Sequence, residues 1–208
     1  MERIRPHVGE KYHSLASRGL KIMILGESSY KPGGFPPTQS AARQTISLAE
    51  DAVGYDQGQG YWNKSRFYTR IARIFGYDAY DFVARKEFWS RISFYNYLQI
   101  VLPSARIAPH STSWRDAQEP FLETVQELEP DFILSFSMRM WPHLPKSEDV
   151  TDVHNENNAW AKRACVFLMG GKTACLLGFK HPSSRGFYWE SVRNIVKNQI
   201  DLDEFRSA

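Results

Sequence analysis

Hydrophobic positions along the chain fall into short, nearly unbroken runs separated by longer amphipathic segments. Three such runs, at residues 20–26, 131–137 and 173–179, lead directly into polar residues. Runs of this kind are typical of strands buried on both faces of a sheet. A fourth strand is predicted around residues 92–96, inside the aromatic-rich stretch 87–102, although such a short apolar run is also compatible with a helix. The chain therefore holds four candidate strands for one central sheet.

The segments between these runs carry apolar residues at helical spacing. In residues 63–76 an apolar side chain recurs every three or four positions, and Gly76 ends the pattern. The amphipathic pattern of residues 113–130 ends at Pro130, because proline cannot continue a helix. The remaining assignments are an N-terminal helix or lead-in at residues 1–18, a helix at 38–53 and a closing helix at 186–200, with 155–171 undecided.

Strands that alternate with helices predict a single α/β domain over residues 1–208. We expect a three-layer α/β/α architecture around a central, mostly parallel four-stranded sheet. In such sheets, ligands bind beyond the carboxyl ends of the strands. The candidate site is therefore made of the residues that directly follow the predicted strands, at 27–30, 96, 137–141 and 180–184.

Composition excludes several classes of protein. Two cysteines, Cys165 and Cys175, are too few for a disulfide framework or a four-cysteine metal or iron–sulfur site, and we expect both to be core thiols. His143 and His154 are separated by a spacing that fits no standard ligand pattern, so no metal is expected. The 14% aromatic content is high enough to supply both a core and rings that stack on a flat ligand.

Hydropathy and charge bear on location and partners. No apolar run approaches the roughly 18 residues that span a bilayer, and no signal-peptide pattern is present. We therefore expect a cytoplasmic, monomeric protein with no membrane partner. The net charge of +3 does not by itself indicate nucleic-acid binding. Basic residues do gather at 63–91 and 180–197, where a solvated mixed surface and a nucleic-acid contact are both compatible with them.

Two turns at predicted strand ends carry the candidate chemistry. The first is Gly26-Glu27-Ser28-Ser29-Tyr30, which follows the strand at 20–26. The second is His181-Pro182-Ser183-Ser184, which follows the strand at 173–179; its proline restrains the histidine backbone, and its serines suit a phosphate oxygen.

Taken in this order, the two turns resemble motifs of the uracil-DNA glycosylase superfamily. The first motif of that family has forms such as Gly-Gln-Asp-Pro-Tyr or Gly-Glu-Ala-Pro-Gly, and its last motif is a His-Pro-Ser-rich turn. Asn96, in "SFYNYL", is similar to the family's asparagine after the second strand. The resemblance implies a uracil-DNA glycosylase-like fold, DNA as partner, no cofactor, and excision of a deaminated base such as uracil.

The resemblance also implies roles for individual residues. Glu27, Ser28 and His181 would be catalytic, with His181 donating a hydrogen bond to the departing base. The residues that would bind the base are Gly26, Tyr30, Phe35 and Asn96, with Tyr30 beside C5 of uracil and Phe35 stacked on the ring. The residues that would hold DNA phosphates or wedge into the duplex are Ser183, Ser184, Arg185 and Phe187.

The first motif departs from the family pattern at two positions. Ser28 stands where the most active branch has the aspartate that positions water, and Ser29 replaces a proline. Glu27 supplies a carboxylate one position earlier, as in the iron–sulfur branch, although the cysteines of that branch are absent. The sequence therefore leaves open whether Glu27 takes over the role of the missing aspartate.

Two other functions are compatible with the same residues. The chain could be a nucleic-acid-binding module of this fold without turnover. It could also be a serine hydrolase, because Gly26-Glu27-Ser28 resembles the start of a nucleophile elbow and His181 follows late in the chain. That triad would need a distant acid such as Asp152.

Overall fold

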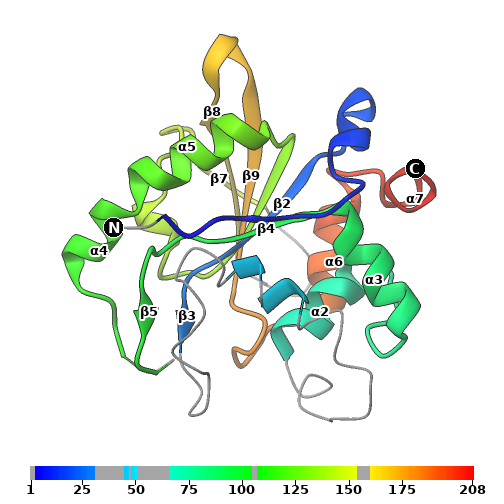
Figure 1. The fold of residues 1–208 in the computed structure, drawn as a ribbon, viewed down its shortest axis with the longest axis horizontal. Helices are drawn as coiled ribbons and strands as arrows, with labels where there is room; N and C mark the ends of the chain where they lie inside the picture. The colour runs from blue at the N-terminus through cyan, green and yellow to red at the C-terminus, as the bar shows by residue number, and fades with distance from the viewer. Residues whose placement is uncertain (1–2, 31–44, 47, 51–65, 105–106, 154–159) are drawn as a thin grey trace.

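A mixed sheet runs through the centre of the molecule (Figure 1). The computed structural model describes residues 3–30, 45–46, 48–50, 66–104, 107–153 and 160–208. In these residues the sheet has seven strands in the order β1-β4-β2-β6-β9-β8-β7. The central strands β4 (Ser93–Asn96), β2 (Ile22–Gly26), β6 (Phe132–Phe136) and β9 (Thr173–Phe179) are parallel to one another.

The predicted number of four strands is wrong, because three antiparallel strands extend the parallel centre. They are β1 (His7–Val8) at one edge, and β8 (Ala161–Phe167) and β7 (Thr151–Asp152) at the other. β1 and β7 are two residues long and carry no readable pattern. β1 lies in the stretch 1–18, for which a helix or lead-in is expected, and a 3-10 helix follows it at His13–Arg18. β8 lies in the undecided segment and alternates between buried and more exposed residues, as an antiparallel strand near an edge does.

Two hydrophobic cores lie on opposite faces of the sheet. Successive strand side chains point to opposite faces, so Ile24 packs with α2 (Arg66–Ile74), α3 (Phe82–Arg91), α6 (Trp189–Lys197) and α7 (Leu202–Ser207). On the other face, Leu25 packs with α4 (Ser111–Asp116) and α5 (Gln118–Leu128). Helices therefore cover both faces (Figure 1), and the fold is of the mixed α/β class.

The helix predicted at 113–130 is split in two. α4 and α5 meet at Ala117, and α5 ends where Glu129 adopts φ 44°, directly before Pro130. The residue before a proline is disfavoured in helical geometry, so the helix stops before it. The helix predicted at 38–53 lies largely outside the described residues.

A second, two-stranded sheet lies beyond the carboxyl end of β2. There β3 (Ser29–Tyr30) pairs in parallel with β5 (Val101–Leu102). Two residues after the end of β2 the chain forms β3, and β5, the partner of β3, follows β4 along the chain. This arrangement fixes both ends of the Gly26–Tyr30 turn in paired backbone.

Candidate functional site

The candidate site lies at the carboxyl edge of the parallel strands, which is the lower edge of the sheet in Figure 1. Gly26 at the end of β2 is in register with Asn96 at the end of β4. Ser137 directly follows β6, and His181 follows β9 by two residues. Because these strands are parallel neighbours, the turns that follow them come together at one edge.

Glu27 is the charged centre of this edge. The Ser137 hydroxyl donates to Glu27 Oε2 at 2.6 Å, and Arg139 Nε donates to the same oxygen at 3.2 Å. Arg139 Nη2 pairs with Oε1, so the guanidinium grips both carboxylate oxygens. The Glu27 side chain is only 10% exposed, whereas that of Arg139 is 45% exposed. The hydrogen bond to Glu27 raises the pKa of Arg139. The site thus holds a nearly buried anion, neutralised from the solvent side by Arg139.

His181 is held as a neutral ring with its Nε2–H available as a donor. Its Nδ1 lies 3.1 Å from the backbone nitrogen of Ser183. That N–H can only donate, so Nδ1 accepts and the ring proton resides on Nε2. Burial lowers the pKa of His181; the negative charge of Glu27 acts against this shift, and the positive charge of Arg139 adds to it. A neutral imidazole near a carboxylate and a guanidinium can therefore offer one hydrogen bond to a ligand.

Helix α2 supports the turn that carries His181. The Phe67 ring lies 5.2 Å from the His181 ring between centroids. Arg70 donates to the backbone oxygen of Pro182, and its guanidinium carbon lies 5.8 Å from the centre of the Phe187 ring. Both ends of the turn are thus anchored to α2, which reduces the freedom of the histidine before any ligand binds.

Asn96 is buried, at 3% exposure, next to a glycine that has no side chain. A Cβ on Gly26 would collide with Asn96 Oδ1, so only glycine leaves space for the carboxamide in this position. Within the part of the chain that the structure describes, the Asn96 side chain forms no hydrogen bond. A carboxamide in this setting offers one acceptor and two donor hydrogens to a ligand edge.

This close approach leads to a testable expectation for Gly26→Ala. The added methyl should displace the Asn96 carboxamide. Binding of uracil-containing DNA, the ligand that the motif resemblance implies, should then weaken roughly tenfold, which corresponds to about 1.4 kcal/mol. Fluorescence anisotropy with a labelled oligonucleotide measures this loss. Because both changes act through one carboxamide, Gly26→Ala combined with Asn96→Ala should bind no more weakly than Asn96→Ala alone. Additive losses would contradict the explanation.

The structure brings some of the predicted site residues together and leaves others apart. Gly26, Glu27, Asn96 and His181 gather at the strand ends, with Ser28 half-buried beside them. The phosphate and wedge candidates Ser183, Ser184 and Arg185 are exposed. Phe35 and the side chain of Tyr30 lie outside the described residues.

Phe187 differs from the expectation for a wedge. It is 6% exposed and belongs to the core, where its ring lies 6.4 Å from that of Phe136. A wedge must project from the surface to enter a duplex, so Arg185 is the one of the two wedge candidates that meets this requirement. The apolar character of Phe187 is used for packing under Arg70 instead.

Sequence reasoning assigned no role to Ser137, Arg139, Phe67 or Arg70. Ser137 and Arg139 do lie in residues 137–141, which follow a predicted strand. Their position after a strand is the sequence feature that points to the site. Phe67 and Arg70 lie on a helix that precedes the His181 turn by more than a hundred residues, as the Arg70–Pro182 bond spans 112 positions. No local pattern predicts a contact of that kind.

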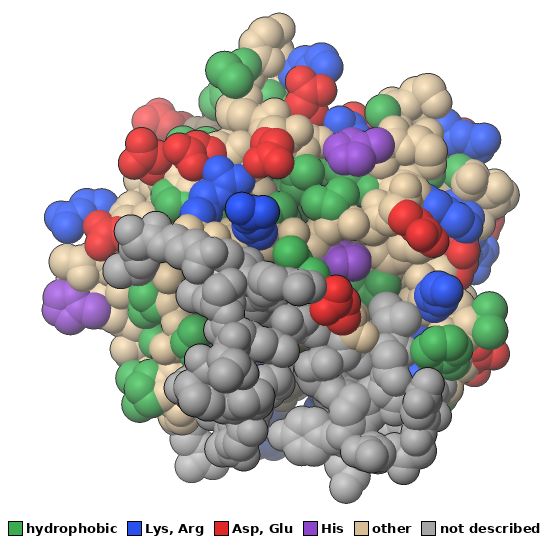
Figure 2. Space-filling model, in the orientation of Figure 1, with side chains coloured by type: hydrophobic (Ala, Val, Ile, Leu, Met, Phe, Trp, Pro, Cys, Tyr) green, Lys and Arg blue, Asp and Glu red, His purple; other side chains and the backbone are tan. Residues whose placement is uncertain are grey.

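Two of the basic residues at 63–91 are part of the folded core rather than of the surface. Arg85 and Arg91 are buried, at 6% and 5% exposure, and Arg91 donates to the backbone oxygen of Phe205 at 2.8 Å. These two side chains belong to the fold rather than to a ligand surface. On the face in Figure 2, acidic side chains gather at the upper left, and the basic side chains of the described residues form no continuous patch.

The triad of a serine hydrolase is not assembled. His181 Nδ1 accepts from Ser183, whereas a triad histidine must donate from this nitrogen to an acid. Asp152 lies on the edge strand β7 and pairs with Lys162. Among the residues with described positions, no hydrogen bond joins Ser28 to His181.

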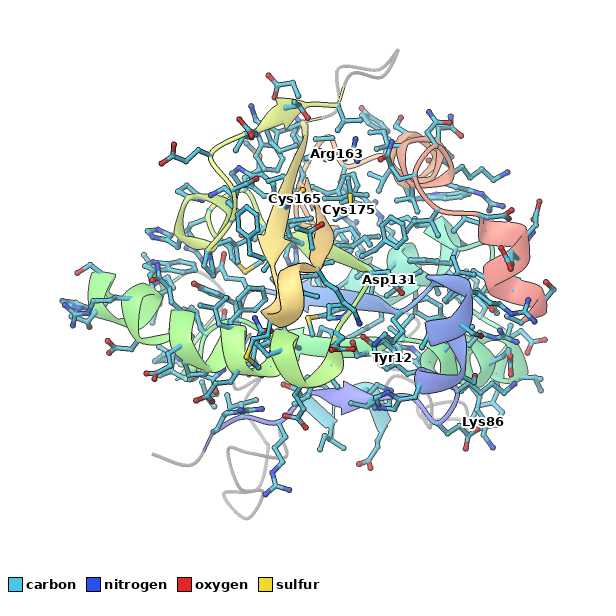
Figure 3. The ribbon with its side chains drawn as sticks, turned by 90° about the horizontal axis from the view of Figure 1, so that it is seen from above. Tyr12, Lys86, Asp131, Arg163, Cys165 and Cys175 are labelled. Carbon is cyan, nitrogen blue, oxygen red and sulfur yellow. The ribbon has the colours of Figure 1, made fainter. Side chains whose placement is uncertain are left out.

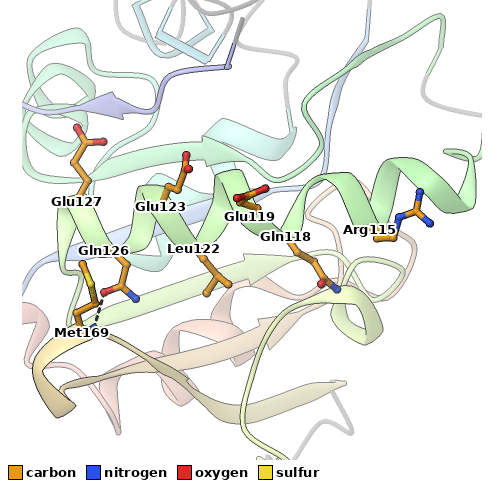
Figure 4. Close-up of a pocket in the computed structure, with 8 residues that line it drawn as sticks. All are labelled: Arg115, Gln118, Glu119, Leu122, Glu123, Gln126, Glu127 and Met169. Carbon is orange, nitrogen blue, oxygen red and sulfur yellow. Dashed lines mark hydrogen bonds between the residues drawn. The ribbon is translucent and has the colours of Figure 1, made fainter. Parts of the chain in front are cut away.

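A shallow groove elsewhere on the surface has the wrong charge for nucleic acid. It runs along α5 and past the β8–β9 hairpin, and Glu119, Glu123 and Glu127 all line it (Figure 4). Arg3 binds two of these carboxylates, Glu123 at 2.8 Å and Glu127 at 3.0 Å. Phosphates would be repelled by this acidic row, so the strand-end site remains the candidate.

Searches for other classes of site and for relatives add no assignment. Within the described ranges, no group of three or more His, Cys, Asp or Glu side chains is placed to hold a metal ion. No helix in those ranges is long and apolar enough to cross a membrane. Comparison with models of protein families gives no match, and comparison with curated proteins gives no significant match either.

The lowered pKa of His181 predicts a pH-dependent stability. Below the ordinary histidine pKa of 6.5, the unfolded chain binds a proton at this position more readily than half-buried His181 does in the folded protein, so stability falls on acidification. His7 is also half-buried, and its lowered pKa acts in the same direction. Urea denaturation at about pH 7 and about pH 5 should therefore show a smaller loss for His181→Gln than for the wild type. An equal loss in both proteins would mean that His181 is not buried as a neutral ring.

Proposed function

We propose that this protein is a DNA glycosylase with a uracil-DNA glycosylase-like fold, which flips a deaminated base, uracil or a related one, and hydrolyses its N-glycosidic bond. The observation that carries the proposal is the meeting of three groups at one strand edge. They are the Nε2–H donor of neutral His181, the nearly buried carboxylate of Glu27 and the buried carboxamide of Asn96.

These groups match the charges that develop when the bond breaks. A base in a duplex is unreachable, so the nucleotide is first extruded at a cost of a few kcal/mol. As the bond to C1′ breaks, the base gains negative charge and the sugar gains positive charge. His181 donates to the base oxygen that becomes anionic, as a preorganised donor. Asn96 reads the pyrimidine edge through its donor and acceptor.

In this scheme, the Glu27 carboxylate is the negative charge that lies beside the sugar, where positive charge develops. A carboxylate has about four lone-pair sites, and Ser137 and Arg139 use three of them. The remaining one is available to a water molecule that attacks C1′. Water then supplies the hydroxyl on the sugar, and its proton balances the charge of the departing base. Arg139 contacts both carboxylate oxygens and so holds the carboxylate in place.

The exposed turn after His181 is suited to the DNA backbone. The Ser183 and Ser184 hydroxyls are of the kind that bind phosphate oxygens, and Arg185 adds a positive charge. The backbone N–H groups of both serines donate to His181 within the turn. A cytoplasmic, monomeric protein remains our expectation for the intact chain.

A binding module without turnover is the second candidate. The observation that favours it is the ion pair between Glu27 and Arg139. A carboxylate whose role is to hold this arginine in place would take no part in a reaction. In that case Asn96 and His181 would still recognise a flipped base, and DNA would be bound but not cleaved at the glycosidic bond.

One assay tests the proposal. The protein is incubated with labelled single- and double-stranded oligonucleotides that contain uracil, hypoxanthine or xanthine, and abasic sites are then cleaved. Strand cleavage that depends on the damaged base supports the glycosylase. Binding without cleavage on any of these substrates supports the binding module and overturns the enzymatic proposal.

A further inference from the structure

Both cysteines of the chain face each other across neighbouring strands. Cys165 on β8 is the direct register partner of Cys175 on β9 (Figure 3). The chain has two cysteines, so these are its whole complement of thiols. Both residues are half-buried, and Cys175 packs against the hydrophobic core, so the expectation of core thiols is met only in part.

The hydrogen-bond pattern places this pair at the closest type of cross-strand position. Leu168 N–H donates to Lys172 at 2.9 Å, so that pair is hydrogen-bonded, and alternation makes Cys165–Cys175 a non-hydrogen-bonded pair. Their backbone groups indeed point outward. Cys175 N–H donates to Asp131 on the β6 side at 2.9 Å, and Cys165 exchanges bonds with Ser147 at 2.8 and 3.0 Å.

This position fits a disulfide without movement of the strands. In non-hydrogen-bonded pairs the Cα atoms are about 4.5 Å apart and the side chains lean toward each other. Disulfides accept Cα separations of about 4.4 to 6.8 Å. Arg163, two residues before Cys165, reaches the Cys175 thiol and favours its thiolate form, while burial acts more strongly in the opposite direction and raises the pKa of Cys175.

We propose that Cys165 and Cys175 form a redox-sensitive dithiol that a low-molecular-weight disulfide, such as oxidised glutathione, converts to a cross-strand disulfide. One protein thiolate attacks the glutathione disulfide, which forms a mixed disulfide and expels one glutathione thiolate. The second protein thiolate then attacks the protein sulfur and expels the other. Two protein thiols are oxidised, one glutathione disulfide is reduced to two thiols, and the two thiol protons pass to the departing glutathiones.

The order of attack follows from the surroundings of the two thiols. Cys175 lies on β9, between β6 and β8, and packs against the core, so it is the less accessible thiol. Burial also raises its pKa, which makes it the poorer first nucleophile. Cys165 therefore forms the mixed disulfide, and Cys175 resolves it. The neighbouring thiol is held in register by the β8–β9 ladder, so resolution should outpace the addition of a second glutathione.

The test uses the intact, folded protein with oxidised glutathione, thiol titration and intact-mass measurement. We expect the wild type to lose both free thiols and a pair of hydrogen atoms, without a glutathione adduct, and dithiothreitol to restore them. Cys175→Ser should stop at a glutathione adduct on Cys165, and Cys165→Ser should react much more slowly. Stable glutathione adducts on the folded wild type, or thiols that react only after denaturation, would overturn the proposal.

Discussion

Replacement of His181 by alanine should lower the rate of base excision by about 10²- to 10³-fold, as the loss of one preorganised donor to a developing anion does. DNA affinity should change little, because the exposed residues Ser183 to Arg185 remain in place. Single-turnover kinetics with a uracil-containing duplex gives the rate, and anisotropy with the same duplex gives the affinity.

Two further variants distinguish loss of the hydrogen-bond donor at His181 from a displacement of the turn that holds it. His181→Asn keeps a side-chain N–H and should recover part of the rate. Arg70→Ala removes the bond to Pro182 and should reduce the rate through the position of His181, with its pH dependence unchanged. If His181→Ala weakened binding as much as it slowed excision, the histidine would act as a DNA contact rather than as a donor in the transition state.

The parallel centre of the fold is predictable because of how parallel strands are buried. β2, β6 and β9 are covered on both faces, so their sequences read as continuous apolar runs. β1 and β7 pair through too few residues to leave a pattern, and β8 has one face that is partly exposed. The sheet's extent was therefore underestimated at its antiparallel edges.

The candidate site is likewise predictable from the sequence only in part. Residues that follow strands converge because topology brings the strand ends together, and this holds for Gly26, Asn96 and His181 whatever their side chains. The grip of Arg139 on Glu27 depends on the rotamers of two side chains 112 positions apart. Contacts of that type, like those of α2 with the His181 turn, follow from packing in three dimensions and have no periodic signal in sequence.

Glu27→Gln should reduce the excision rate by about 10²- to 10⁴-fold, the usual contribution of a positioned general base. Glutamine keeps an acceptor oxygen for the Ser137 hydroxyl, which donates to Glu27 at 2.6 Å; it removes the charge and replaces the oxygen that contacts Arg139 Nη2 with an NH2 group that cannot accept. The variant should therefore remain folded, and its thermal melting provides the check. The rate is measured under single-turnover conditions on the base that the wild type excises fastest.

Arg139→Gln is the matched control, because it breaks the same ion pair from the other side. If Glu27 acts on the water or on the sugar cation, its variant loses far more activity than Arg139→Gln does. If the pair is only structural, the two single variants and the double variant should lose similar stability, with little effect on rate. A Glu27→Gln protein that retains the wild-type rate would rule out the carboxylate as the substitute for the aspartate that Ser28 replaces. The excision step would then depend on His181 and Asn96 alone, which predicts a slow enzyme whose activity is lost entirely in the His181→Ala protein.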